Sequence, residues 1–337
     1  MNILLTGNAG FIGHHLSLKL AKQSNINKVY CIDSINSYYE VELKYRRLLE
    51  QGFQKEQISY GKFIYSSLTE KLEFAQVDIS ELNDVVSLLG NLQIDLIINL
   101  AAQAGVRYSL TNPAAYFKSN VQGFFNILEY ARLNNIRNVM YASSSSVYGN
   151  SKEIPYREDA KLEPPSSFYA ATKMNNESMA LSYSHIYGLN TIGLRFFTVY
   201  GPWGRPDMAY FIFTKSILEN KPINVFNHGD LYRDFTYIDD IIDGIKIILE
   251  NLDFENIKSA EVYNLGNNKP TKLTDFITTL ENIIGKQAIK NNIEMQTGDL
   301  YITHADISLI NRKYGWSPKT NLEEGLRNFV RWYDIQQ

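Results

Sequence analysis

Short apolar runs alternate with helical patterns from the first residue of the chain, and this alternation limits the folds open to it. The runs occupy residues 2–5, 29–32, 72–77, 96–100, 139–142 and 191–196. Strands this apolar are buried on both faces, which indicates a parallel sheet covered by helices. The sequence therefore predicts an α/β fold with a doubly wound parallel sheet.

The alternation ends after Phe197, where loops rich in Pro, Gly and aromatic residues begin. This change predicts a smaller C-terminal lobe. We assign residues 1–195 and about 236–265 to the first domain, and residues 196–235 and 266–337 to the lobe. A polar helical stretch at residues 40–50, between two strands, is interpreted as part of a surface insertion.

The composition favours a globular protein without nucleic-acid or membrane partners. The net charge is -3, which gives no general attraction to polyanions. No apolar run reaches the roughly 18 residues of a membrane-spanning helix. The single Cys31 fits a reducing compartment, so we expect a cytoplasmic protein. The histidines lack metal-ligand spacing, and no metal is expected.

Three glycines separate the first strand from the first helix. Gly7, Gly10 and Gly13 permit a tight turn and a close approach of backbone amides to a pyrophosphate at the helix N-terminus. This context is typical of a Rossmann-type dinucleotide site. Asp33 ends the second strand, where an acid binds ribose hydroxyls and favours NAD over NADP, unless it is an ordinary turn residue. Asp78, with Ile79, is either an adenine contact or a helix N-cap.

Tyr169 and Lys173 are four residues apart, which places them on one helix face. A nearby ammonium favours the phenolate and lowers the pKa of a tyrosine, which makes the phenol a usable general base. Ser144, in a run of four serines, offers a second hydroxyl at the reacting oxygen. Taken alone, the pattern also fits a packed aromatic beside a solvated lysine.

Together these motifs resemble the extended short-chain dehydrogenase/reductase superfamily, in its nucleotide-sugar epimerase/dehydratase branch. The resemblance covers nearly the whole chain. It is carried by residues 6–13, 99–103, 144–149, 169–173, 195–202, 233–240, 298–299 and 305–306.

The resemblance implies a tightly bound NAD that is reduced and reoxidised in every turnover, with Tyr169, Lys173 and Ser144 as catalytic residues. It implies that cofactor-binding residues follow the strands and include the catalytic pair. These are Gly7, Gly10, Phe11, Ile12, Gly13, Asp33, Asp78, Ile79, Leu100, Ala101, Ala102, Gln103, Asn120, Tyr169, Lys173 and Phe196.

Finer features resemble the UDP-glucuronate 4-epimerases of this branch. They lie at residues 104–109, 204–209 and 223–227. Dehydratases and decarboxylases of the branch carry an acid just before Val-Tyr-Gly, whereas this chain has Ser145 and Ser146 there. Without that acid a departing hydroxyl is not protonated. The implied reaction is C4 epimerisation of UDP-glucuronate to UDP-galacturonate through a 4-keto intermediate, for surface polysaccharide synthesis.

The resemblance also implies residues that bind the UDP-hexuronate. They are Arg107, Ser144, Ser145, Tyr169, Thr198, Arg205, Val225, Phe226, Asn227, Arg233 and Asp299. Arg233 and Arg107 are assigned to the diphosphate and Asp299 to the uridine ribose. Arg205 is either near the sugar carboxylate or a structural tie within its loop, and Phe226 is either a uracil contact or a core residue.

Other functions stay open at this point. The nearest alternative is a 4-epimerase of UDP-N-acetylglucosamine or UDP-glucose, followed by a UDP-glucuronate decarboxylase. A non-catalytic NAD-binding regulator is disfavoured because Tyr169, Lys173 and Ser144 are all present. The resemblance implies a homodimer formed through residues 113–134 and the helix that carries Tyr169.

Overall fold

The computed structural model describes residues 1–90, 92–252, 260–296 and 298–336. The chain forms two compact units. The first comprises residues 1–147, 167–195 and 248–263, and the second comprises residues 148–166, 196–247 and 264–337. The expected division differs from this grouping, because it assigned residues 148–166 and 236–247 to the first domain. The expected segment 236–265 also includes residues 253–259, which lie outside the described residues.

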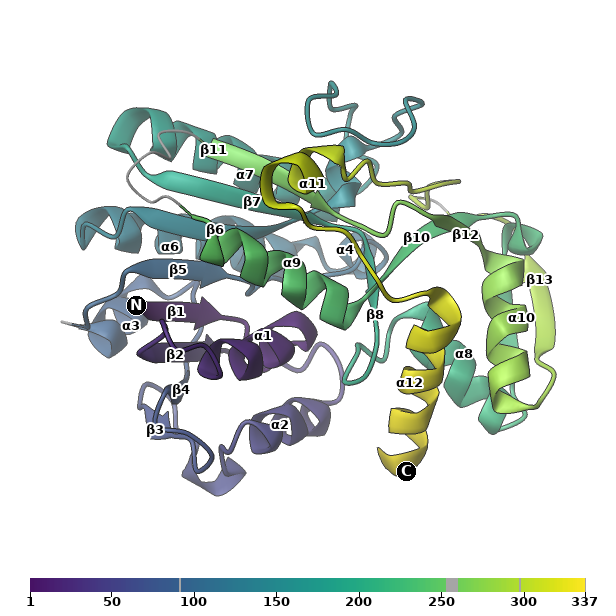
Figure 1. The fold of residues 1–337 in the computed structure, drawn as a ribbon, viewed down its shortest axis with the longest axis horizontal. Coiled ribbons are helices and arrows are strands. Elements are labelled where there is room, and N and C mark those ends of the chain that lie inside the picture. The colour runs from purple at the N-terminus through teal and green to yellow at the C-terminus, as the bar shows by residue number, and fades with distance from the viewer. Residues whose placement is uncertain (91, 253–259, 297, 337) are drawn as a thin grey trace. The chain divides into compact units, whose positions relative to one another are not determined.

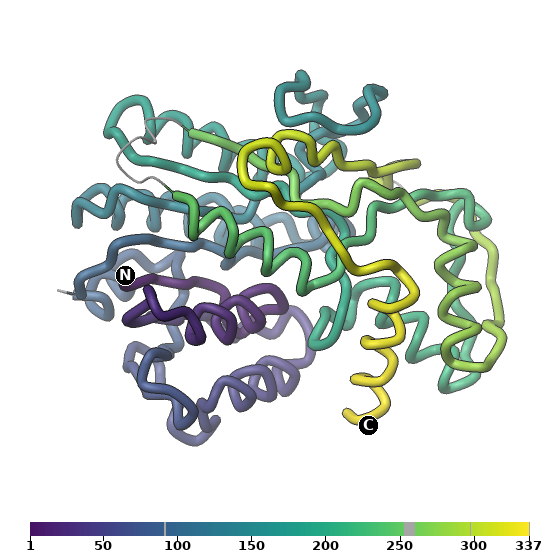
Figure 2. Tube along the Cα trace, viewed as in Figure 1, coloured from purple at the N-terminus to yellow at the C-terminus, as the bar shows by residue number. Residues whose placement is uncertain are grey.

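An eight-stranded sheet organises the first unit, in the order β11-β7-β6-β5-β1-β2-β4-β3. The strands are β1 (Asn2–Thr6), β2 (Lys28–Asp33), β3 (Ile64–Tyr65), β4 (Leu72–Gln76), β5 (Leu96–Asn99), β6 (Asn138–Ser144), β7 (Asn190–Phe196) and β11 (Ala260–Leu265). From β6 to β4 every neighbouring pair is parallel, and β3 is antiparallel at the edge. Figures 1 and 2 show β1 between β2 and β5. The predicted α/β, Rossmann-type fold is confirmed.

Helices cover the sheet of the first unit and bury its apolar side chains. They are α1 (Phe11–Ala21), α2 (Val41–Glu50), α3 (Leu82–Leu89), α4 (Tyr108–Thr111), α5 (Pro113–Tyr116), a π-helical turn (Phe117–Gln122), α6 (Gly123–Leu133) and α7 (Phe168–Tyr187). Ile97 and Val139 of the sheet belong to one core with Val85 of α3, Ile127 of α6 and Ala180 of α7. Burial of such side chains contributes about 1.5–3 kcal/mol each.

Parallel pairing brings the carboxyl ends of these strands to one edge of the sheet. The segments that follow β1, β2, β4, β5 and β6 therefore begin at this edge. In open α/β sheets ligands bind outside the carboxyl ends of the strands. The topology thus brings the glycine loop, Asp33, Asp78, Leu100 and Ser144 to the edge formed by the carboxyl ends of the strands.

The second unit contains two small sheets and their helices. The strands are β8 (Thr198–Tyr200), β9 (Pro222–Phe226), β10 (Tyr232–Tyr237), β12 (Pro270–Lys272) and β13 (Ile289–Ile293). The helices are α8 (Ala209–Leu218), α9 (Ile238–Glu250), α10 (Leu273–Ile284), α11 (Ser308–Tyr314) and α12 (Leu322–Gln336). Aromatic rings fill its core, and the rings of Phe235 and Phe276 stack with their centroids 4.5 Å apart.

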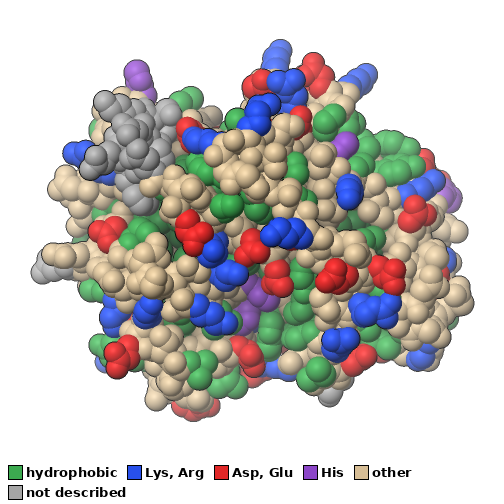
Figure 3. Space-filling model, viewed as in Figure 1, with side chains coloured by type: hydrophobic (Ala, Val, Ile, Leu, Met, Phe, Trp, Pro, Cys, Tyr) green, Lys and Arg blue, Asp and Glu red, His purple; other side chains and the backbone are tan. Residues whose placement is uncertain are grey.

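Charges are mixed on the visible surface, and the face in Figure 3 intersperses Lys and Arg with Asp and Glu side chains. Within the described ranges, no helix combines the length and apolarity needed to cross a membrane.

Asp234 of β10 is a buried carboxylate that holds two other backbone segments of the second unit. Its oxygens accept hydrogen bonds from the backbone N–H groups of Asn267 at 2.5 Å, Asn268 at 3.0 Å and Ala305 at 2.9 Å. Burial raises the pKa of Asp234, which the backbone donors partly oppose. The side chain therefore acts as an acceptor that backbone donors require.

Replacing Asp234 by Asn should destabilise the second unit by about 2–3 kcal/mol, because an amide offers only one acceptor oxygen to these donors. Urea unfolding followed by circular dichroism measures the change. The control is Asp334→Asn at an exposed position of α12, which should shift stability by less than about 0.5 kcal/mol. Equal stability of the two variants would contradict this account.

Candidate active site

Tyr169 and Lys173 lie on the same face of α7, one turn apart. The helix begins after Ser167, whose hydroxyl oxygen accepts a hydrogen bond from the backbone N–H of Ala170. The Lys173 Nζ atom is 6.0 Å from the centre of the Tyr169 ring. The structure thus gives the arrangement that the four-residue spacing predicts, a phenol with an ammonium beside it.

Lys173 is almost fully buried, and its Nζ donates a hydrogen bond of 2.8 Å to the carbonyl of Ala142. Burial lowers the pKa of Lys173 to about 8, although the Glu177 carboxylate pulls it upward. Below that pH the side chain carries its charge. At neutral pH it is therefore a cation next to the phenol of Tyr169.

Glu177 and Arg195 form a buried ion pair one turn beyond Lys173. The carboxylate accepts hydrogen bonds from Arg195 Nε at 2.9 Å, Arg195 Nη2 at 2.8 Å and the hydroxyl of Ser143 at 2.6 Å. These contacts fasten α7 to the ends of β6 and β7. The sequence reasoning gave neither residue a role, although Glu177 continues the four-residue spacing of Tyr169 and Lys173.

Ser144 ends β6 and is 9% exposed. Its hydroxyl oxygen accepts hydrogen bonds from the backbone N–H of Ser146 at 3.2 Å and from the Ser146 hydroxyl at 3.0 Å. Because Ala142 and Ser143 both contact α7, the end of β6 lies against the helix that carries Tyr169. Ser145 is half-buried.

A network from the π-helical turn supports the candidate catalytic helix. Asn120 lies in this turn, a distortion that is frequent at functional sites. Its side chain exchanges hydrogen bonds with the backbone N–H and carbonyl of Gln103, and donates to the hydroxyl of Thr172 at 3.0 Å. The ring of Tyr116 packs edge-on against Tyr169, with centroids 6.0 Å apart. These contacts join the segment after β5 to α7.

The glycine positions of the loop have no room for side chains. A Cβ atom at Gly7 would lie 2.6 Å from the backbone nitrogen of Ala101, and one at Gly13 would lie 2.2 Å from the Gly7 carbonyl oxygen. Gly7 also has a φ of +76°. Gly10 precedes α1 without a side-chain cap. The loop thus forms a cradle of backbone at a helix N-terminus, which suits a pyrophosphate.

Asp33 faces the glycine loop. Its carboxylate accepts hydrogen bonds from the backbone N–H groups of Ala9 at 3.2 Å and Ile35 at 2.8 Å. The carboxylate is therefore held at the end of β2, next to the loop. This is the position from which an acid binds the adenosine ribose of a dinucleotide.

Helix α2 supports both loops, and its description as part of a surface insertion was wrong. Lys44 and Arg47 are 5% and 0% exposed. Lys44 Nζ donates hydrogen bonds of 2.7 Å to the backbone and side-chain oxygens of Asn36, and Arg47 Nη1 donates one of 3.0 Å to the carbonyl of Ala9. Burial lowers the pKa of Lys44, and Asp33 opposes the shift. Polar residues had suggested exposure, but here they satisfy the backbone of the loops.

A cavity of about 530 Å³ opens among the segments after the strands. It is lined by Ser34, Asn36, Ser37, Tyr38, Tyr60, Asp78, Glu81, Gln103, Tyr108, Ala115, Lys118 and Ser119. Within the described residues, the side-chain nitrogen of Gln103 is buried and has no hydrogen-bond partner. Buried polar groups normally have one. This amide therefore points to a ligand that offers an acceptor.

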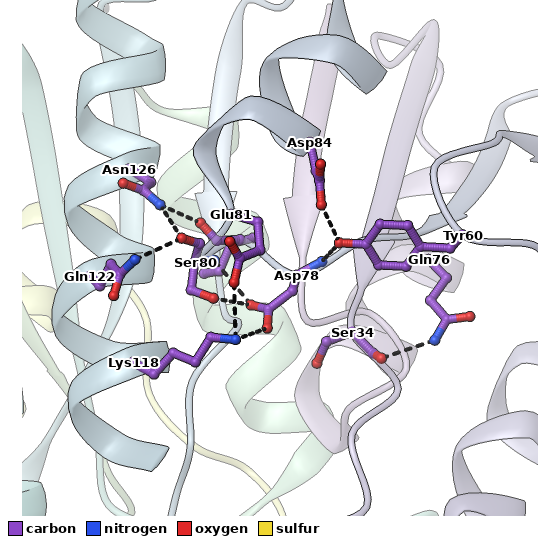
Figure 4. Close-up of polar contacts among 11 residues, drawn as sticks. Ser34, Tyr60, Gln76, Asp78, Ser80, Glu81, Asp84, Lys118, Gln122 and Asn126 are labelled. Carbon is purple, nitrogen blue, oxygen red and sulfur yellow. Dashed lines mark hydrogen bonds and ion pairs between the residues drawn. The ribbon is translucent and has the colours of Figure 1, made fainter. Parts of the chain in front are cut away.

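Asp78 lines the cavity and is not the N-cap of α3, which is Glu81. One carboxylate oxygen accepts hydrogen bonds from the backbone N–H and hydroxyl of Ser80, and the other is 3.3 Å from Lys118 Nζ (Figure 4). Burial raises the pKa of Asp78, but the Ser80 bonds and Lys118 outweigh it and lower the pKa overall. Tyr60 also lines the cavity, and its hydroxyl donates a hydrogen bond of 2.6 Å to Asp84.

The remaining sequence-predicted residues occupy both units. Ala101 and Ala102 are half-buried after β5, Ile79 belongs to the core, and Arg107 is exposed. In the second unit, Phe196 and Val225 are buried, and Thr198, Phe226 and Asp299 are half-buried. The side chain of Asn227 donates a hydrogen bond to the carbonyl of Asp230 at 2.7 Å.

Two predicted arginines of the second unit have contacts of their own. Arg205 pairs with Asp207 through two hydrogen bonds, of 3.0 and 2.6 Å. This pair is the loop tie that the sequence left open as an alternative. Arg233 Nη1 donates to the carbonyls of Tyr232 at 2.9 Å and Tyr301 at 3.4 Å, so it lies beside the segment that follows Asp299.

The pH dependence of stability should report the burial of Lys173. Its pKa is about 8 in the folded chain and about 10.4 in an unfolded one, so between these values the unfolded chain binds more protons. The contribution of Lys173 to the unfolding free energy therefore rises with pH between these two pKa values. We expect the unfolding free energy of the wild type, minus that of Lys173→Met, to increase by about 2 kcal/mol from about pH 7.5 to about pH 9.5.

Urea unfolding of protein freed of bound nucleotide gives this difference. Lys22→Met, at an exposed position just after α1, serves as the control and should show no such dependence. A flat difference for Lys173→Met would mean that the ammonium is solvated.

Comparisons with known proteins agree with this geometry. Residues 3–266 match the model of the NAD dependent epimerase/dehydratase family. Protein CapI of Staphylococcus aureus is 45% identical over 99% of this chain and 98% of its own length. UDP-glucuronate 4-epimerase 4 of Arabidopsis thaliana is 42% identical over 99% of this chain and 75% of its own.

A crystal structure of the UDP-glucuronic acid 4-epimerase from Bacillus cereus, in complex with UDP-glucuronic acid and NAD, is similar over all of both chains. It is 32% identical, with a TM-score of 0.87. The match to the family model spans the glycine loop, Asp33, Ser144 and the Tyr169–Lys173 pair on α7. The chain belongs to the NAD dependent epimerase/dehydratase family.

Proposed function

We propose that this chain is an NAD-dependent UDP-glucuronate 4-epimerase that interconverts UDP-glucuronate and UDP-galacturonate. The observation that carries the proposal is Tyr169 beside the buried Lys173, at the strand ends that hold the glycine cradle. The relatives named UDP-glucuronate 4-epimerases and the structure with UDP-glucuronic acid and NAD support the choice of sugar. The Gly7–Gly13 cradle and the orphaned Gln103 amide fit a dinucleotide.

The proposed chemistry begins at the 4-hydroxyl of the sugar. NAD, when bound, supplies a hydride acceptor and donor for C4. Tyr169, as phenolate, takes the hydroxyl proton, and the charged Lys173 stabilises the phenolate. Ser144 donates a hydrogen bond to the same oxygen while it becomes a carbonyl. When the keto sugar has turned its other face, Tyr169 returns the proton, and the configuration at C4 is inverted.

The sugar carboxylate sets a further requirement, because a 4-keto hexuronate is a β-keto acid that loses carbon dioxide readily. The carboxylate must therefore be held where the bond that would break is poorly aligned with the C4 carbonyl. Hydroxyl donors in the plane of the carboxylate can do this without a strong electron demand. Ser144, Ser145 and Thr198 are the proposed donors. The pairing of Arg205 with Asp207 supports this choice, since a neutralised guanidinium is a weaker competitor for the carboxylate. We assign Arg233 and Arg107 to the diphosphate and Asp299 to the uridine ribose.

Replacing Tyr169 by Phe should lower turnover of UDP-glucuronate at least about a hundredfold, because the proton acceptor is removed. Bound NAD should remain, since the ring is kept. Turnover is measured by chromatographic separation of UDP-glucuronate and UDP-galacturonate, and NAD by its absorbance after denaturation. Tyr187→Phe, near the end of the same helix, is the matched control and should be fully active. Full activity of the Tyr169 variant would refute the mechanism.

The same separation tests the substrate. Purified protein is mixed in turn with UDP-glucuronate, UDP-N-acetylglucosamine and UDP-glucose. Conversion of UDP-glucuronate to UDP-galacturonate alone is the expected result. Conversion of only one of the other sugars would overturn the substrate, whereas release of carbon dioxide would indicate a decarboxylase.

We also propose that the chain forms a homodimer through α6 and α7. Their outer faces expose large apolar side chains, including Phe125 at 43%, Leu181 at 59% and Ile186 at 62%. These two helices pack on each other in the first unit. A second copy that presents the same face would remove these side chains from water.

Leu181→Glu should shift the protein from dimer to monomer at micromolar concentration, because a carboxylate would be buried in the interface. Light scattering coupled to size-exclusion chromatography measures the mass. Ile335→Glu, at an even more exposed position of α12, should leave the mass unchanged. A monomeric wild type would rule out the proposed dimer.

A further inference from the structure

Two tyrosine rings from different strand ends meet at the cavity. Tyr38 belongs to the segment after β2 and Tyr108 begins α4, in the segment after β5. Their centroids are 4.9 Å apart with planes inclined by 41°. Both residues line the cavity that Gln103, with its orphaned side-chain nitrogen, also lines.

The Tyr38–Tyr108 contact joins segments that follow two strands which are not neighbours in the sheet. β1 lies between β5 and β2, so the two segments start on opposite sides of the strand that ends in the glycine loop. The Tyr38–Tyr108 contact therefore links the neighbours of β1 with each other at the edge where the cavity opens. A dinucleotide whose pyrophosphate sits on the glycine loop would start from the strand between the two linked segments and meet the cavity that both tyrosines line.

Each tyrosine belongs to a segment that has an anchor of its own. The hydroxyl oxygen of Tyr108 accepts a hydrogen bond of 2.7 Å from the side chain of Asn112. The ring of Tyr108 also packs near that of Tyr116, with centroids 6.2 Å apart. The Tyr38 segment is held through Asn36, which the buried Lys44 fixes to α2. Each side of the contact thus has an anchor within its own part of the fold.

We propose that the Tyr38–Tyr108 contact is a clasp that retains the dinucleotide in this enzyme, an inference that rests on the proposed function. An epimerase of this kind must keep its reduced cofactor while the keto sugar turns. A pair of aromatic rings that must separate before the dinucleotide leaves slows its escape. In this proposal Tyr38 and Tyr108 control the release of the cofactor and take no part in the proton transfer at Tyr169.

The experiment follows release of radiolabelled NAD from the loaded protein during a chase with excess unlabelled NAD. Loss of an aromatic pair of about 0.5–1.5 kcal/mol corresponds to a roughly two- to tenfold faster release. We expect this acceleration for Tyr38→Ala and for Tyr108→Ala. Because the rings act as one contact, the double variant should release NAD no faster than the quicker single variant.

Two controls accompany these variants. Tyr38→Phe keeps the ring and should release NAD at the wild-type rate, which separates stacking from hydroxyl chemistry. Tyr65→Ala removes a tyrosine that is 68% exposed on the edge strand β3 and should also change nothing. Where an alanine variant unfolds, the corresponding leucine variant fills the space without an aromatic face, and the same acceleration is expected.

The outcomes separate the clasp from the function on which it rests. Release rates equal to wild type in both single variants would overturn the clasp, and so would effects that multiply in the double variant. Either result leaves the NAD-dependent function standing. A wild-type protein that binds no NAD would instead refute the proposed cofactor and the clasp together.

Discussion

The desolvated ammonium of Lys173 is the constraint on which the candidate site depends. A buried cation is costly unless its hydrogen bonds are satisfied. Here the carbonyl of Ala142 accepts one bond, and the carboxylate of Glu177 one turn away provides opposite charge. Glu177 is in turn fastened by Arg195 and Ser143. The end of β6 and the face of α7 that carries Tyr169 are thereby held together.

The same principle recurs beneath the glycine loop and in the second unit. Arg47 and Lys44 are buried cations whose donors satisfy backbone carbonyls of the cofactor-side loops. Asp234 is the converse, a buried carboxylate that accepts from backbone N–H groups. In each case a charged side chain makes the hydrogen bonds to loop backbone groups that a strand or helix would otherwise make. The backbone of these loops is thus held by hydrogen bonds to side chains rather than by pairing within a sheet or helix.

The sequence allowed the frame to be predicted because the frame follows from local pattern. Apolar runs gave the parallel strands, and glycines at close spacing gave the cradle, where the Gly13 position leaves no space for a Cβ atom. The four-residue spacing gave Tyr169 and Lys173 on one face. What escaped prediction depends on distant partners. Helix α2 reads as polar, and only its contacts with Ala9 and Asn36 show why Arg47 and Lys44 are buried.

Retaining a cofactor and using it in catalysis require different mechanical properties of the residues at the carboxyl ends of the strands. The proposed catalysis needs Tyr169 fixed, and the Glu177–Arg195 pair on the same helix and the Tyr116 ring against Tyr169 favour this. Release needs a part that moves, and a ring contact between two separately anchored segments is well suited, since opening it breaks neither anchor. Tyr116 contacts both Tyr108 and Tyr169, so the two demands meet at one ring. The fixed part lies on α7 and the movable part between the segments after β2 and β5.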